Sequence, residues 1–288
     1  MLKKRIIASL NILNNIVVQS IGFKKYFPVG KPEIAVEFLN DWGIDEIILL
    51  DIGATKNGYK PNLEMIKKVS SFNMVPLTVG GGISNIRDIE NLMHCGADKV
   101  CVNSLLSKDL SQVNEASMIF GSQSIVASID IKEINGKKRV FNYLNQTTLD
   151  LDFIEHAKNI EDIGVGEIFI NSVDNDGKKQ GYDYDLIGSI SNAVNIPVIG
   201  CGGAGSPKHM LELLKRTSVC GAVAGNFFHF YEHSVNITKS IIGKQIEMRD
   251  DCYYHYRDLD FNNEGRLLRK SEDDLEKLLY VKHIKEEI

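Results

Sequence analysis

The hydrophobic residues of this chain fall into two recurring patterns. Short β-branched runs, typical of buried strands, begin near residues 5, 46, 75, 99, 124, 167, 196 and 220. Between them lie stretches with the apolar spacing of amphipathic helices, most clearly at 32–43, 61–72, 85–96, 150–164 and 206–217. Short strands that alternate with helices predict βα units and a parallel sheet.

Local signals mark where several of these elements begin and end. Pro32 stands at a first-turn position of the earliest predicted helix, and Gly43 closes it. Ser206 is a plausible N-cap before Pro207. After the fifth strand, Asn135-Gly136 lies between alternating residues, which predicts a small hairpin inserted in a loop.

The chain also repeats itself. "EIILLDIGATKNGYKPN" (46–62) aligns without a gap with "EIFINSVDNDGKKQGYD" (167–183), an offset of 121 residues. The same offset places "VPLTVGGGIS" (75–84) on "IPVIGCGGAG" (196–205). Each half, roughly 1–120 and 121–242, holds four strand-like runs. This arrangement predicts a closed (β/α)8 TIM barrel built from two fourfold half-barrels.

The last part of the chain does not follow the repeat. We expect the barrel to occupy residues 1–242 and a charged, tyrosine-rich extension to occupy 243–288. "SEDDLEKLLYVKHIKEEI" (271–288) has a serine at its start, early acids and late lysines, which predicts a terminal helix. This helix could pack on the barrel wall, or it could dock a partner or a second copy.

Composition narrows the classes of function. A net charge of −5 gives no overall attraction to nucleic acid or anionic membranes. The basic start and the following apolar run could be a signal peptide, but Asn11, Asn14 and Asn15 interrupt the run, so we expect a first strand in a cytoplasmic protein. The five scattered cysteines predict reduced thiols, and the histidines lack metal-ligand spacing. We therefore expect no metal and no cofactor.

The barrel prediction converts sequence position into geometry. Chemistry in such barrels sits at the carboxyl ends of the strands. These ends carry Asn11, Asp51, Gly81, Gly82, Asn103, Ser104, Asp130, residues 172–176, Gly202, Gly203, Ala224 and Gly225. The strand starts at the opposite face carry Arg5, Glu46, Lys99 and Glu167.

Glycines that follow a strand directly leave backbone N–H groups free to bind an anion. Gly81 and Gly82, with Asn103 and Ser104 after the next strand, form one such predicted phosphate cradle; we also assign Asp176 and Gly177 to this first cradle. The related second cradle comprises Gly202, Gly203, Ala224 and Gly225. Alternatively, these glycines only make tight turns. Two cradles across one mouth imply a ligand with two phosphates or phosphate-like groups.

Several motifs taken together resemble the HisA/HisF family of phosphosugar barrels, and its HisF branch in particular. They are "KRIIASLNI", "IDEIILLDI", "VGGGI", "GADKVCVNS", "FGSQSIVASIDIK", "GVGEIFINSVDNDGKKQGYD" and "GGAG", which cover residues 1 to about 240. HisF is the cyclase subunit of imidazole glycerol phosphate synthase. The resemblance implies a HisH-like glutaminase partner whose ammonia passes through the barrel to a phosphorylated small molecule.

The resemblance also implies roles for residues at the two faces. Arg5, Glu46, Lys99 and Glu167 match the ammonia gate at the amino-terminal face, and Asp98 matches a glutaminase contact. From spacing alone, the four charges could equally be a salt-bridge cluster that plugs the barrel.

The family's catalytic pair consists of two aspartates, on the first and fifth strands. Asp130 matches one, but Asn11 stands at the other, and an amide cannot shuttle a proton near neutral pH. The family also has a lysine in its mobile first loop, where this chain has Gln19; Lys24 or Lys25 could substitute for it.

These departures suggest a changed reaction that still consumes ammonia. The chain resembles a HisF-like branch that supplies ammonia for acetamidino groups on bacterial surface-polysaccharide sugars, in "EIFINSVDNDG", "IGCGGAGS" and "LLKRTSVCGAVAGNFF". The alternatives are the cyclase of histidine biosynthesis and a non-catalytic phosphate-binding scaffold. A HisA-like isomerase fits less well, since it needs the acid/base pair and not the charged ring.

Overall fold

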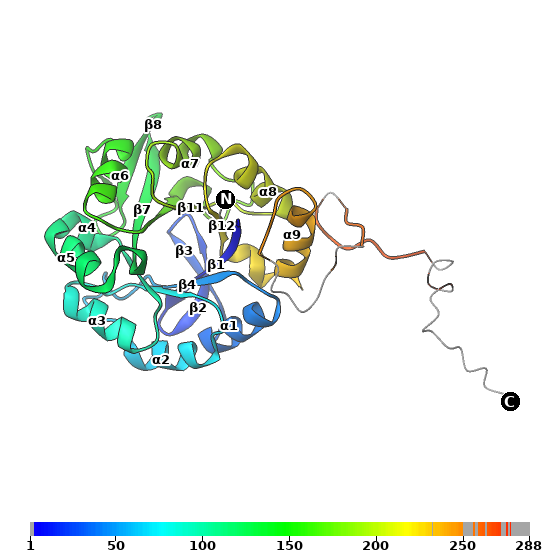
Figure 1. The fold of residues 1–288 in the computed structure, drawn as a ribbon, viewed down its shortest axis with the longest axis horizontal. Coiled ribbons are helices and arrows are strands. Elements are labelled where there is room, and N and C mark those ends of the chain that lie inside the picture. The colour runs from blue at the N-terminus through cyan, green and yellow to red at the C-terminus, as the bar shows by residue number, and fades with distance from the viewer. Residues whose placement is uncertain are drawn as a thin grey trace.

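The parallel strands close into a barrel surrounded by helices (Figure 1). The computed structural model describes residues 3–231, 233–249, 256, 259–262, 264–271, 275 and 277. β12 pairs with β1 and β7 pairs with β10, so the sheet has no open edge among its barrel strands. In order around the barrel these strands are β1 (Arg5–Leu13), β4 (Glu46–Asp51), β5 (Leu77–Gly80), β6 (Lys99–Val102), β7 (Ile125–Ile134), β10 (Glu167–Ser172), β11 (Val198–Cys201) and β12 (Gly221–Ala224).

The helices form the outer ring, and the five stretches predicted as helices between residues 32 and 217 are helical. Ser206 is the N-cap of its helix, and its side chain accepts a hydrogen bond from the His209 N–H. The helices are α1 (Pro32–Asp41), α2 (Leu63–Phe72), α3 (Ile86–His94), α4 (Ser104–Lys108), α5 (Leu110–Phe120), α6 (Phe153–Asp162), α7 (Tyr184–Ser191), α8 (Pro207–Arg216) and α9 (Ser234–Gly243), with 3-10 turns η1 (Ser122–Ser124), η2 (Val173–Asn175) and η3 (Asn226–His229).

Two hairpins project from the carboxyl ends of strands. The predicted one is confirmed: β7 runs into β8 (Lys137–Asn142) through Asn135 and Gly136, both with positive φ, and a short β9 (Thr147–Thr148) follows. The other corrects our expectation of a loop after the first strand. There β2 (Ile16–Ile21) pairs with β1 and with β3 (Lys25–Gly30).

The two halves of the barrel share backbone detail as well as sequence. Gly81 and Gly202 have φ values of 103° and 101°, and Gly82 and Gly203 have 73° and 102°. A Cβ on Gly81 would lie 2.2 Å from the Asp51 carbonyl oxygen. The backbone therefore requires glycine at these turns whether or not an anion binds there.

The hydrophobic core has two parts. The larger part lies between the strands and the surrounding helices. The smaller part fills the inside of the barrel, and we call it the apolar layer: Ile7, Ile48, Cys101, Val126, Phe169, Ile199 and Val223. Burying each large apolar side chain of this kind stabilises the fold by about 1.5–3 kcal/mol.

A buried ion pair fastens α9 to the barrel. Lys239 donates to Asp45 Oδ1 at 2.7 Å and to the Gly43 carbonyl at 2.8 Å. The second oxygen of Asp45 accepts the N–H of Ile6, at the start of the barrel, at 2.7 Å. Beyond α9, Phe261 and Leu267 form an isolated antiparallel bridge. The predicted terminal helix, 271–288, lies almost wholly outside the described residues.

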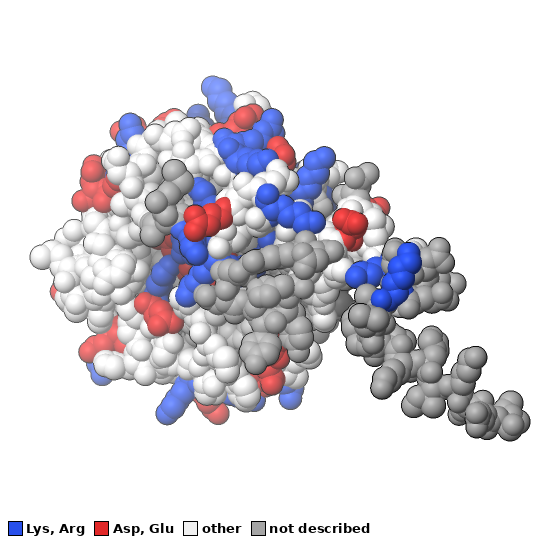
Figure 2. Space-filling model, turned by 45° about the vertical axis from the view of Figure 1, so that its right-hand side comes forward, with Lys and Arg blue, Asp and Glu red and all other residues white. Residues whose placement is uncertain are grey.

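The described part of the chain contains no helix that is long and apolar enough to cross a membrane. On the face drawn in Figure 2, acidic and basic side chains of the described residues are interspersed rather than gathered into one broad basic surface.

Candidate active site at the barrel mouth

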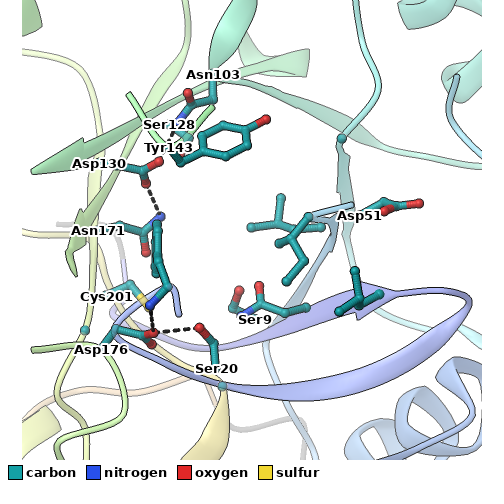
Figure 3. A pocket seen from close by; sticks show the side chains of 18 of the residues that line it. Ser9, Ser20, Asp51, Asn103, Ser128, Asp130, Tyr143, Asn171, Asp176 and Cys201 are labelled. Carbon is teal, nitrogen blue, oxygen red and sulfur yellow. Dashed lines mark hydrogen bonds between the residues drawn. The ribbon is translucent and has the colours of Figure 1, made fainter. Parts of the chain in front are cut away.

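A cavity of about 580 Å³ opens at the carboxyl ends of the strands (Figure 3). Its volume is that of a small-molecule site. Most of the predicted mouth residues line it: Asn11, Gly81, Asn103, Ser104, Asp130, Asp176, Gly177, Gly202, Gly203, Ala224 and Gly225. Gly82 does not line it.

Asp130 is a buried carboxylate held by two amides. It accepts hydrogen bonds from Asn103 Nδ2 at 3.0 Å and from Asn171 Nδ2 at 3.1 Å. Burial raises the pKa of Asp130 to about 6, although both hydrogen bonds favour the charged form. A carboxyl group with this pKa can both accept and donate a proton near neutral pH.

Asn11 lines the same cavity from the other side. β1 and β7 are four strands apart in either direction around the barrel, so Asn11 and Asp130 occupy opposite walls. The two cradles, at β5–β6 and β11–β12, are also opposite one another. A ligand that bridged the cradles would therefore pass between Asn11 and Asp130.

Sequence reasoning missed Asn171, which orients Asp130. The signal was present in the period of two along β10, because Asn171 falls on the same face as Glu167 and Phe169, which point into the barrel. It also missed Tyr143, which lines the cavity and is hydrogen-bonded with Thr55 and Ser104.

Two further carboxylates line the cavity, and each accepts hydrogen bonds that stabilise a loop or hairpin. Asp51 accepts the N–H groups of Gly53 and Ala54 in its own loop. Asp176 accepts the Ser20 hydroxyl at 2.6 Å and the Phe23 N–H at 3.2 Å. Burial raises the pKa of both groups. Asp130 is bound only by side-chain amides, which leaves it the best placed of the three for proton transfer.

The β2–β3 hairpin is fastened over one side of the mouth. Besides the bonds to Asp176, Asn226 both donates to and accepts from the backbone of Ser20, at 2.6 Å and 3.1 Å. A Cβ on Gly177 would lie 2.7 Å from the Ser20 carbonyl oxygen, so Gly177 allows the hairpin to approach. Lys24 and Tyr26 line the cavity from this hairpin, whereas Gln19 and Lys25 do not.

This geometry corrects our assignment of two residues, which lie beside the second cradle and not the first. We expected Asp176 and Gly177 beside Gly82 and Asn103, but they follow β10, which pairs with β11 of the second cradle. A Cβ on Gly203 would lie 3.2 Å from Asn175, next to Asp176. The repeat held this information, because its offset places Asp176 and Gly177 on Thr55 and Lys56, which follow β4, and β4 pairs with β5 of the first cradle.

Each cradle combines a glycine turn with the start of a short helical turn. The first joins Gly81 and Gly82 to the start of α4, and the second joins Gly202 and Gly203 to the start of η3. The Gly82 N–H donates to Thr55 Oγ1 at 3.0 Å, so Thr55 already occupies one donor of the first cradle.

The cavity thiols are not nucleophiles. Burial raises the pKa of Cys201 to about 12 and raises that of Cys101 further. Both thiols therefore stay protonated near neutral pH, and a thiol is a poor nucleophile compared with a thiolate.

Below the cavity, at the strand starts, Arg5, Glu46, Lys99 and Glu167 form a closed charged ring. Arg5 bonds Glu46 at 2.5 Å and also bonds Glu167; Lys99 bonds both glutamates at 2.9 Å. Burial opposes the charge on Arg5, but the carboxylates of Glu167 and Glu46 outweigh it and hold its pKa above the ordinary value. The apolar layer fills the barrel between this ring and the cavity.

Asp98 lies beside this ring and is exposed. Its carboxylate accepts the Leu77 N–H at 2.8 Å, at the start of β5. It therefore has a structural bond in addition to its predicted contact with a glutaminase. Among the described residues, no group of three or more histidine, cysteine or acidic side chains is arranged to hold a metal ion.

Comparison with known proteins gives one consistent result. A family profile described as "Histidine biosynthesis protein" matches residues 5–234. A Clostridium botulinum protein named imidazole glycerol phosphate synthase subunit HisF is 40% identical over 247 residues, which are 85% of this chain and 98% of that protein. A Bacillus cereus protein of the same name is 39% identical over 253 residues, 86% of this chain and 100% of its own length.

A third relative matches more of the chain. It is a Vibrio vulnificus protein with the provisional name imidazole glycerol phosphate synthase subunit hisF2. It is 36% identical over 264 residues, which are 91% of this chain and 97% of that protein.

Proposed function

This chain belongs to the family of histidine biosynthesis proteins, and from that membership we propose that it is a HisF-type subunit of a glutamine amidotransferase. In this proposal a HisH-like glutaminase binds the amino-terminal face of the barrel, near Asp98, and releases ammonia there. The ammonia then reaches a phosphorylated small molecule held in the mouth cavity. The names of the relatives, which are those of synthase subunits, support a partner protein.

The charged ring is the observation that carries the proposal. It joins two cations to two anions at the base of a barrel whose opposite end holds a cavity with a protonatable carboxylate. A partner that breaks one of these ion pairs would open the base, and small movements of the apolar layer would then admit a neutral molecule. If the charged ring only closed the base of the barrel, its role would be independent of Asp130 and the cradles at the opposite end.

We further propose that the reaction is not the standard ring closure. Asp130 alone can transfer protons across the bound ligand, because Asn11 on the opposite wall can only donate and accept hydrogen bonds. Lys24 is placed to substitute for the loop lysine, since it lines the cavity. The leading candidate is amidination, namely the formation of an acetamidino group on a bacterial surface-polysaccharide sugar.

The cyclase of histidine biosynthesis is the second candidate, and the names of the relatives at about 40% identity favour it. Complementation of a histidine auxotroph separates the two. We expect the wild-type chain, expressed with its glutaminase, not to restore growth. Growth without histidine would establish the cyclase reading and overturn amidination.

Ammonia delivery is tested by co-purifying the chain with a HisH-like glutaminase. We expect complex formation to raise glutamine hydrolysis by at least about 10-fold, and Lys99→Ala to uncouple hydrolysis from use of the ammonia. Lys68→Ala is the matched control, since its partner Glu33 lies in an exposed ion pair on the helical surface. Equal effects of the two substitutions, or no complex, would contradict the proposal. Turnover that never depends on ammonia would instead indicate a binding scaffold.

A further inference from the structure

A second cavity lies beside the second cradle, where residues 264–267 contact the barrel. It has a volume of about 260 Å³. We call it the aromatic pocket, because three aromatic side chains form its inner wall. Its lining residues are Pro207, Phe227, Phe230, Tyr231, Ser234, Ile237, Glu264, Gly265, Arg266 and Leu267.

The aromatic pocket and the mouth cavity share a wall. Phe227 lines both cavities, and it follows directly after Gly225 and Asn226 of the second cradle. Pro207 begins α8, four residues after Gly203. The aromatic pocket therefore lies next to the second cradle, with Phe227 between the two cavities.

Two cations flank the aromatic rings. Lys179 Nζ lies 4.8 Å from the centre of the Phe230 ring, and the Arg266 guanidinium lies 5.6 Å from the centre of the Tyr231 ring. A Cβ on Gly205 would lie 2.3 Å from the Lys179 carbonyl oxygen, so the loop that carries Lys179 packs against the loop of the second cradle. Positive charge and aromatic faces thus occur together next to a predicted phosphate site.

The outer wall of the aromatic pocket comes from the extension, residues 264–267 (in the orange part of the chain in Figure 1). The C. botulinum relative aligns with 85% of this chain, and the V. vulnificus relative aligns with 91% of it.

From these observations we propose that the aromatic pocket binds the base of a nucleotide-linked substrate. The phosphate lies in the second cradle, the base stacks among Phe227, Phe230 and Tyr231, and the reacting group enters the mouth cavity. The pocket is smaller than a complete small-molecule site, which fits one ring rather than a whole ligand. Aromatic stacking of a base and cations beside its phosphate are the usual means of nucleotide recognition.

This assignment rests on the proposed function only in taking the second cradle as a phosphate site. It is tested by calorimetric titration of the full chain with uridine 5′-monophosphate, adenosine 5′-monophosphate and inorganic phosphate. We expect at least one nucleotide to bind 10-fold or more tightly than phosphate. Phe230→Ala is expected to weaken nucleotide binding about 5-fold or more and to leave phosphate binding unchanged, because stacking acts on the base alone.

Phe38→Ala is the matched control, since Phe38 on α1 is 53% exposed and Phe230 is 52% exposed. Gly265→Val provides a second variant that leaves the rings intact. Gly265 has a φ of 80°, and its Cβ would lie 2.8 Å from Pro207, so the substitution displaces the outer wall and is also expected to weaken nucleotide binding. Circular dichroism verifies that each variant is folded.

The outcomes separate this inference from the proposed function. Nucleotides that bind no more tightly than inorganic phosphate would overturn the aromatic-pocket assignment and leave the cradle and the ammonia route standing. Nucleotide binding that survives both Phe230→Ala and Gly265→Val would also overturn it. Failure of phosphate itself to bind would remove the second cradle and, with it, both proposals for this side of the mouth.

Discussion

Asp130 shows how one side chain can be useful in the site and unfavourable for the fold. It is buried, its pKa is raised to about 6, and its two hydrogen-bond donors are side-chain amides rather than cations. A buried carboxylate without a cation destabilises the folded state once it ionises. Groups held in this condition are common at functional sites.

Replacing Asp130 should therefore separate stability from activity. Between about pH 4 and pH 6 the folded wild type keeps a proton that the unfolded chain has released, so this contribution to the free energy of unfolding falls as pH rises and is lost above about pH 6. Asp130→Asn has no carboxyl group at this position, so its free energy of unfolding does not show this fall with rising pH. Relative to wild type, the variant should gain about 2 kcal/mol between pH 4.5 and pH 7.5. Turnover should fall by roughly 100-fold or more.

Thermal melts at the two pH values measure this difference. Asp150→Asn serves as the control, because the Asp150 side chain is 94% exposed and its removal uncovers no buried group. A gap between Asp130→Asn and wild type that stays constant with pH would show that folding does not raise the pKa of Asp130.

At the scale of elements, the β2–β3 hairpin is the part that determines access to the cavity. Its contacts across the mouth are few: the two bonds between Asn226 and the Ser20 backbone, and the bonds that end on Asp176. Elements held by few bonds open far more often than the core. The hairpin is thus placed to admit a ligand without disturbing the barrel.

Asn226→Ala should loosen this hairpin selectively. The two lost hydrogen bonds contribute about 1 kcal/mol each, so amide hydrogen exchange in β2 and β3 should become about 30-fold faster, while β4 and β10 keep their protection. Asn142→Ala is the control, since Asn142 binds only the turn of the other hairpin, at Leu144 and Asn145. Unchanged exchange in β2 and β3 would mean that Asn226 does not fasten the hairpin.

The sequence predicted the barrel well because its signals are local and repeated. Strand runs, helix caps and the Asn135-Gly136 turn each act over a few residues, and the repeat confirmed their order. The turn from β1 into β2 was missed even though Asn14 and Asn15 both adopt positive φ, as a two-residue hairpin turn requires. Asparagine pairs are a weaker signal than Asn-Gly, and the expectation of a mobile loop outweighed them.

The candidate site was predicted only in part, because its contacts join distant segments. Most residues predicted from the strand ends line the cavity. They could not show that Asp176 fastens the hairpin, that Thr55 caps the Gly82 N–H, or that the extension adds a wall beside Phe227. These contacts depend on loop conformation, which residue spacing does not determine. The sequence also could not separate glycines that make turns from glycines that bind anions, since one backbone serves both.

At the scale of the whole molecule, the last helix of the barrel is joined to its first strand through Lys239 and Asp45. Burial raises the pKa of Asp45, and the attraction of Lys239 opposes that rise. The pair is almost fully buried, with side-chain exposures of 8% and 1%. Removing one partner of such a pair leaves an uncompensated charge, which costs about 3–5 kcal/mol.

Lys239→Ala should therefore lower the melting temperature by about 6–20 °C. Lys68→Ala removes an exposed ion pair instead and should change stability by less than about 1 kcal/mol. Denaturant titration of both variants measures the two values. Similar losses would mean that α9 is not held to the barrel by this pair.

The hydrocarbon-filled middle of the barrel has a consequence for the proposed ammonia route, because it would discriminate between ammonium and ammonia. Ammonium would have to give up its hydration shell there, whereas the free base carries no charge to strip. A route through this region would admit neutral ammonia and exclude ammonium. The nucleophile would then reach the cavity already deprotonated. Ammonium salts added to the medium would instead enter from the mouth, and their use should climb with pH as the free base becomes more abundant.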